Sequence, residues 1–160
     1  MNLEKYLSNL NLIIVQENDA SHALQQICDK IKQDLNNYDW VGFYFADHST
    51  KKLHLGPYAG EKTDDTIINF GSGICGQVAI SGETYLSEDV SAEENYIACS
   101  INVKSEIVVP LFLNNELIGQ IDIDSNTPRA FDAKDDAFLK ALNKKLAIKY
   151  DSALKSIVSF

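Results

Sequence analysis

Two cysteines and three carboxylates in the second half of the chain are the residues whose types and spacing could do chemistry. Cys75 lies in the sequence Gly-Ser-Gly-Ile-Cys-Gly, and Cys99 follows Tyr-Ile-Ala. Glu106 opens an apolar, β-branched stretch, and Asp122 and Asp124 alternate with isoleucines in Ile-Asp-Ile-Asp-Ser. Thiols near carboxylates within a small β-rich domain indicate redox chemistry on a small molecule.

The carboxylates suit a pocket better than a solvated surface. Strands disfavour Asp, and the period of two puts Asp122 and Asp124 on one face, where like charges repel. Carboxylates crowded into one pocket cannot all ionise, so we expect Glu106 to have a raised pKa and to donate a proton near neutral pH. The two aspartates could then hold an ammonium group, and a solvated strand face is the plain alternative.

The thiols and nearby aromatic side chains have competing interpretations. Cys75 falls in the first turn of a predicted helix, where the backbone dipole favours a thiolate, but it could also be a small packed residue. Cys28 lies in the apolar stripe of a predicted helix, which indicates a structural role. Trp40 and Tyr44 could enclose the apolar end of a ligand or belong to the core.

The composition is that of an ordinary globular domain of 160 residues, with 45% hydrophobic and 23% charged residues. A net charge of -9 argues against a nucleic-acid or anionic-membrane partner and favours a small solute. The N-terminus lacks the pattern of a signal peptide, and no apolar run is long enough to cross a bilayer. We therefore expect a cytoplasmic protein whose cysteines are thiols.

The hydrophobic periodicity predicts one α+β domain over residues 1–160, in which helices at both ends flank an antiparallel sheet. Residues 1–37 form N-terminal helices, 38–126 form the sheet with a lid loop, and 131–155 form a C-terminal helix. The expected inner elements are strands at 38–45, 52–58, 66–70, 84–86, 106–113 and 117–124, a helix at 74–81, and the loop at 88–104, which carries Cys99.

The register of the last predicted hairpin decides whether the carboxylates share a pocket. A two-residue turn at Asn114-Asn115 would set Glu106 opposite Ile123, facing away from the aspartates. A three-residue loop, or a β-bulge at Pro110, would instead set Glu106 opposite Asp124. We predict one of these two devices.

Six motifs, taken in order, resemble the free methionine-(R)-sulfoxide reductases, which are built on a GAF domain. They are Trp-Val-Gly-Phe-Tyr at 40–44, Leu-Gly-Pro-Tyr-Ala-Gly at 55–60, Gly-Ile-Cys-Gly at 73–76, Ile-Ala-Cys at 97–99, Ser-Glu-Ile-Val-Val-Pro at 105–110 and Ile-Asp-Ile-Asp-Ser at 121–125. The resemblance spans about residues 39–146. It implies a six-stranded antiparallel sheet flanked by helices, a homodimer, no metal, no organic cofactor, and thioredoxin as reductant.

The resemblance also implies roles for the thiols. Cys99 is the nucleophile that attacks the sulfoxide sulfur and becomes a sulfenic acid. Cys75 then attacks the sulfenic acid, forming a disulfide that thioredoxin could open.

The remaining residues would bind the substrate. Glu106 would serve as the acid or orient the sulfoxide oxygen, and Asp122 and Asp124 would bind the α-ammonium group. Trp40 and Tyr44 would enclose the methyl sulfoxide end, where an aromatic face favours positive charge on sulfur.

The sequence departs from the family pattern in two places. Asp65 stands ten residues before Cys75, where many members carry a third cysteine, and Asn95-Tyr96 replaces the usual Gly-His. Resolution then falls to Cys75 alone, or recycling is altered.

Other classes of function stay open. The domain could be a stand-alone GAF module that binds a small ligand, or a thiol sensor without turnover. A zinc site is disfavoured because the chain has no Cys-x-x-Cys pair and no ligand spacing among its three histidines. The glycine turn also lacks the lysine of a phosphate-binding loop.

Overall fold

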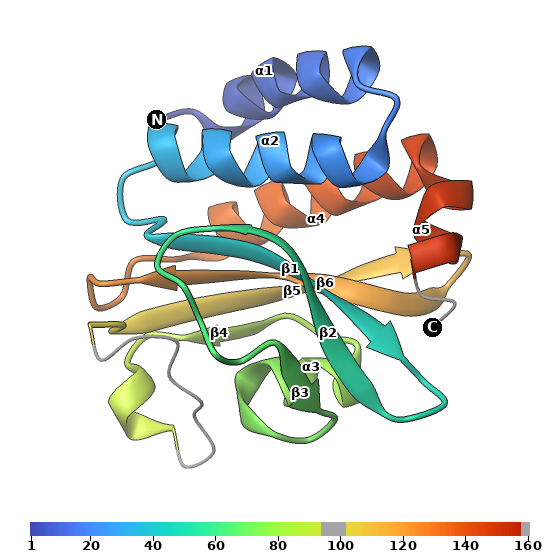
Figure 1. Ribbon diagram of the computed structural model, residues 1–160. Helices are drawn as coiled ribbons and strands as arrows, with labels where there is room; N and C mark the ends of the chain where they lie inside the picture. The colour runs from blue at the N-terminus through green and yellow to red at the C-terminus, as the bar shows by residue number, and fades with distance from the viewer. Residues whose placement is uncertain (94–101, 158–160) are drawn as a thin grey trace.

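The computed structural model describes residues 1–93 and 102–157, which form a six-stranded sheet covered on both faces (Figure 1). The strands are β1 (Trp40–Asp47), β2 (Lys52–Ala59), β3 (Ile67–Asn69), β4 (Tyr85–Ser87), β5 (Ser105–Leu113) and β6 (Glu116–Ser125). Their order is β3-β2-β1-β6-β5-β4, and every pairing is antiparallel. The predicted α+β class and six-stranded antiparallel sheet are confirmed.

The helices divide between the two faces of the sheet. They are α1 (Leu3–Gln16), α2 (Ala20–Asp34), α3 (Gly73–Ser81), α4 (Ala133–Lys149) and α5 (Asp151–Ile157). Figure 1 shows α1, α2 and α4 on one side of the sheet and α3 on the other. In the described ranges, no helix is long and apolar enough to cross a membrane.

Local sequence determines where the long helices begin. Asn2 and Asp19 each cap a helix by accepting a hydrogen bond from the backbone N–H three residues on. Asp132 and Asp135 form a capping box that starts α4. Cys28 lies in the buried stripe of α2, where its thiol donates to the carbonyl of Pro57 at 3.6 Å, so its predicted core position is confirmed.

The two faces of β1 belong to separate cores. Val41 and Phe43 pack toward the long helices, whereas Trp40 and Tyr44 pack on the α3 side. Because both faces are covered, any polar side chain that points toward α3 is removed from water. The predicted carboxylates lie on this second face.

A bulge in the last hairpin sets the predicted register. The turn has two residues, Asn114 and Asn115, both in the left-handed region with φ of 52° and 66°. The ladder then shifts beside Leu111, leaving Ile118 as an extra residue, and Glu106 lies opposite Asp124. The predicted bulge is confirmed in kind, although it falls one residue beyond Pro110 and the three-residue loop is not used.

The prediction of one continuous C-terminal helix over 131–155 is wrong. Tyr150 leaves helical geometry, with φ of −115° and ψ of 27°, and separates α4 from α5. Its buried hydroxyl donates to the carbonyl of Ile14 at 3.3 Å and to that of Glu17 at 2.5 Å. Tyr150 therefore contacts the end of α1 at the position where the hydrophobic periodicity predicted a continuous helix.

The predicted lid loop over 88–104 is only partly within the described residues. Its first part contains a short 3₁₀ turn, Val90–Ala92, and Tyr85 donates to Glu93 at 2.7 Å just beyond it. Residues 94–101, including Cys99, lie outside the described residues, so the lid role stays a prediction.

The β5–β6 turn should tolerate glycine but not alanine. Asn115→Ala places a Cβ in the left-handed region and should lower the free energy of unfolding by about 1 kcal/mol, measured by urea denaturation. The matched change Asn115→Gly should cost no more than a few tenths of that, because glycine adopts this conformation freely. Equal losses in both variants would contradict the explanation.

Candidate functional site

A tight glycine turn places Cys75 against the sheet. Gly71 donates its backbone N–H to the carbonyl of Gly76 at 2.8 Å, folding the turn onto the first residues of α3. A Cβ on Gly76 would lie 2.6 Å from the carbonyl oxygen of Asn69, so this close approach requires glycine. The neighbouring Cys75 is consequently held above the strands with only 5% of its surface exposed.

The structure brings Cys75 together with two of the predicted carboxylates. The Cys75 Sγ lies 3.3 Å from Asp122 Oδ2 and 4.0 Å from Glu106 Oε1. Both carboxylates are buried, with 4% of Glu106 and 1% of Asp122 exposed. Residues that are 31 and 47 positions from Cys75 in the chain therefore share one enclosed site.

Burial and mutual repulsion determine which carboxylate keeps a proton. The pKa of Glu106 is raised well above its ordinary value, first by burial and then by the charges of Asp122 and Asp124. Burial also raises the pKa of Asp122, while hydrogen bonds from Glu106 and Cys75 act in the opposite direction. Glu106 is thus the protonated member and Asp122 the acceptor, which agrees with the expectation for Glu106.

The predicted thiolate at Cys75 is wrong for this state of the protein. Burial, followed by the charges of Asp122 and Glu106, raises the pKa of Cys75 well above its ordinary value. The start of α3 contributes only a partial positive charge, whereas the two acidic groups lie within 4.0 Å of the sulfur. Cys75 is therefore a neutral thiol that donates to Asp122.

A small cavity adjoins this cluster. Its volume is about 10 Å³, and its lining includes Tyr44 and Asp65 as well as Cys75, Glu106 and Asp122. The Tyr44 hydroxyl donates to the backbone carbonyl of Asp65 at 2.8 Å. Asp65 therefore borders the same cavity as Cys75.

Trp40 and Asp124 lie next to the site without lining the described cavity. The Trp40 ring stacks on Tyr58 with centroids 5.3 Å apart, and its Nε1–H donates to the carbonyl of Glu61 at 3.0 Å. Asp124 is 1% exposed and faces Trp40 across β1–β6 and Glu106 across β5–β6. Among the described residues, Tyr44 and not Trp40 is the aromatic side chain that lines the cavity.

Gln120 is a site residue that the sequence analysis missed. Its side chain is fully buried, and its Nε2 donates to the backbone carbonyl of Cys75 at 3.1 Å. It shares the period-two face of Asp122 and Asp124, so a third polar residue on that alternating face was the signal that could have revealed it. Gln120 fixes the helix start that carries the thiol.

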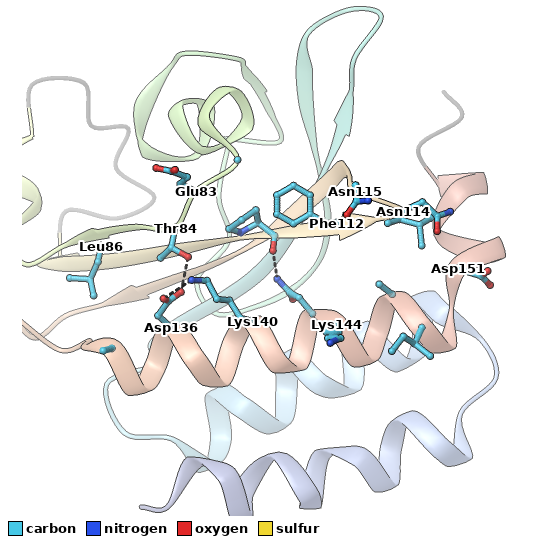
Figure 2. A pocket seen from close by; sticks show the side chains of 17 residues that line it. Glu83, Thr84, Leu86, Phe112, Asn114, Asn115, Asp136, Lys140, Lys144 and Asp151 are labelled. Atoms are coloured by element: carbon cyan, nitrogen blue, oxygen red, sulfur yellow. Dashed lines mark hydrogen bonds and ion pairs between the residues drawn. The ribbon is translucent and has the colours of Figure 1, made fainter.

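A larger groove of about 1070 Å³ lies between α4 and the outer edge of β5 (Figure 2). Three of its polar side chains are paired with each other, since Asp136 accepts from Thr84 at 2.6 Å and contacts Lys140 at 2.9 Å. None of its described lining residues is a cysteine or histidine. The smaller cavity is therefore the better candidate for the reactive site, because it contains a thiol beside buried carboxylates, although the groove is larger.

Comparison with known proteins agrees with this fold. The sequence profile of the GAF domain matches residues 17–148, most of the chain. The chain belongs to the GAF domain family. A free methionine-R-sulfoxide reductase from Saccharomyces cerevisiae is 38% identical over 79% of this chain and 69% of that protein. The Escherichia coli protein of the same name is 31% identical over 91% of this chain and 89% of its own length.

A solved structure extends the likeness to three dimensions. The X-ray structure of free methionine-R-sulfoxide reductase from Neisseria meningitidis, in complex with its substrate, has a TM-score of 0.89 and 34% identity. The match covers 96% of this chain and 91% of that one. Within the GAF family, the chain therefore groups with the free methionine-R-sulfoxide reductases.

Replacing Glu106 should change how stability depends on pH. The native state holds a proton on Glu106 above the ordinary glutamate pKa, so folding is favoured at low pH and that contribution is lost as pH rises toward the raised pKa. Glu106→Gln should increase the free energy of unfolding more at about pH 8 than at about pH 4. The exposed Glu116→Gln is the matched control, and the same change in both variants would contradict the assignment.

Removing the nearest charge should make Cys75 more acidic. Because Asp122 raises the pKa of the thiol, Asp122→Asn should move the midpoint of the alkylation rate against pH to a lower value. Mass spectrometry of the Cys75 peptide in a Cys99→Ser background isolates this thiol. Asp65→Asn should leave the midpoint in place, and an unshifted midpoint in Asp122→Asn would contradict the contact.

Proposed function

We propose that this protein reduces free L-methionine-(R)-sulfoxide to L-methionine by thiol chemistry. The observation that carries the proposal is the buried cluster in which the Cys75 thiol lies 3.3 Å from Asp122 and 4.0 Å from a protonated Glu106. Such a cluster supplies a thiol, a proton donor and a proton acceptor within one site. Relatives that carry the name of this reaction support the same chemistry.

The reaction runs in two balanced steps. The Cys99 thiolate attacks the sulfoxide sulfur, and the sulfoxide oxygen ends on Cys99 as a sulfenic acid while methionine is released. The Cys75 thiol then attacks the sulfenic sulfur, so that a disulfide forms and the oxygen leaves as water. A reductant returns two electrons to the disulfide in each cycle.

The buried acidic groups move the protons of these steps. Glu106 donates its proton to the sulfoxide oxygen, which becomes the hydroxyl group of the sulfenic acid, and this protonation favours attack on the sulfur; Glu106 then regains a proton from solvent. Cys75 must lose its proton before it attacks, and Asp122 Oδ2 is the acceptor already in contact with it. The same contact that holds Cys75 neutral at rest thus removes its proton during resolution.

The amino acid part of the substrate fits the remaining negative groups. Asp122 and Asp124 would bind the α-ammonium group, and the described cavity contains no lysine or arginine to compete for them. Tyr44 and Trp40 would flank the methyl sulfoxide. Because the cavity is only about 10 Å³, binding a molecule as large as methionine sulfoxide requires its walls to move apart.

Recycling, assembly and location complete the proposal. Thioredoxin is the reductant, the protein works as a homodimer in the cytoplasm, and it needs no metal or organic cofactor for turnover. With Asp65 in place of a third cysteine, the disulfide forms between Cys99 and Cys75.

A stereospecific assay tests the reaction. With thioredoxin and its reductase, loss of the free (R)-sulfoxide should exceed loss of the (S)-epimer, and Cys99→Ser should abolish turnover. Glu106→Gln should lower kcat by about 100-fold or more, as expected when a proton donor is removed. No turnover of either epimer by the folded, reduced protein would overturn the proposal and favour the thiol-sensor alternative.

Thiol counting tests the resolving role of Cys75. After one equivalent of methionine sulfoxide, the unchanged protein should lose two free thiols, whereas Cys75→Ser should stop after one turnover. Cys28→Ala is the matched control and should keep full turnover, since Cys28 lies on the buried face of α2. Continued turnover of Cys75→Ser with thioredoxin would show that another group resolves the sulfenic acid.

A further inference from the structure

The cavity beside Cys75 is small enough to hold a single ion or water molecule. Its volume of about 10 Å³ is close to that of one water-sized sphere. Asp122 Oδ1 has no hydrogen-bond partner in the described residues, although Asp122 is only 1% exposed. A buried carboxylate oxygen without a partner is costly, which points to a ligand that would complete its coordination.

The three donor groups have the spacing of a cation site. One donor atom each of Cys75, Glu106 and Asp122 lies within 4.8 Å of the other two. Tetrahedral zinc bonds to sulfur and oxygen place the two ligand atoms about 3.6 Å apart. The observed distances of 3.3 Å and 4.0 Å from the sulfur lie on either side of that value, so small side-chain movements suffice.

The chemistry of the donors selects the kind of ion. A thiolate is a soft ligand and carboxylates are hard, a combination that suits zinc and its softer analogue cadmium better than magnesium or calcium. No lysine or arginine lines the described cavity, so the acidic groups have no fixed positive charge there. A divalent ion would supply the missing positive charge.

We propose that the reduced, substrate-free protein binds one thiophilic divalent cation through Cys75 Sγ, Glu106 Oε1 and Asp122. Binding displaces the protons of the thiol and of Glu106 to solvent and changes no oxidation state. The site goes beyond the proposed reaction and does not require it. Where the reaction operates, the bound ion would hold both Cys75 and Glu106 and thereby inhibit turnover.

Cadmium titration of the full chain tests the site. The reduced protein, freed of reductant and chelator, should develop a thiolate-to-cadmium absorption in the ultraviolet that saturates at one ion per chain, with release of protons. Cys75→Ser should lose the absorption. Glu106→Gln and Asp122→Asn, which keep the thiol, should each weaken binding by at least about tenfold.

Three controls separate ligation from other effects. Cys99→Ser and Cys28→Ala should keep the cadmium absorption, because the proposed donor set is Cys75, Glu106 and Asp122 alone. Asp65→Asn removes a carboxylate that borders the same cavity but lies outside the donor set, and should change the affinity by less than about threefold. Absorption that survives in Cys75→Ser, absorption lost in Cys99→Ser, or equal weakening by Asp65→Asn and Asp122→Asn would each overturn the proposal.

Discussion

The burial of acidic groups beneath α3 is the constraint on which the rest of the structure depends. Glu106, Asp122 and Asp124 all lie on the covered face of the sheet, each less than 5% exposed. A sheet face closed by a helix would normally carry apolar side chains, and each buried charge destabilises the fold unless it is paired or protonated. The hydrogen bond from Cys75 to Asp122 and the raised pKa of Glu106 reduce this cost.

Rigid backbone contacts keep this arrangement in place. Gly76 packs against the carbonyl of Asn69, and Gln120 holds the carbonyl of Cys75 from the strand below. The backbone at Cys75 is thus held by contacts with both Asn69 and Gln120, while the Cys75 sulfur contacts the carboxylates. Such support is typical of sites that must hold reacting atoms within a fraction of an ångström.

Sequence patterns predicted most of the fold because its two periodicities are clear. The apolar stripe that contains Cys28 correctly predicted a buried helix face. The alternating pattern that contains Asp122 correctly predicted a covered strand face. They could not predict the break at Tyr150, whose hydroxyl contacts the end of α1, more than a hundred residues earlier in the chain. The protonation of Cys75 was missed for a similar reason, since its neighbours come from distant strands whose charges outweigh the local helix dipole.

The bulge at Ile118 has a consequence for how this chain can vary. It lies at the far end of the hairpin from Glu106, yet it sets the pairing of β5 residues from Ser105 to Leu111 with β6. A pairing shifted by one residue, as without the bulge, would place Glu106 opposite Ile123 and on the other face of the sheet from Asp122 and Asp124. Changes in the length of this hairpin therefore keep the acidic side chains together only in steps of two residues, so a strand segment remote from the thiol has a fixed parity.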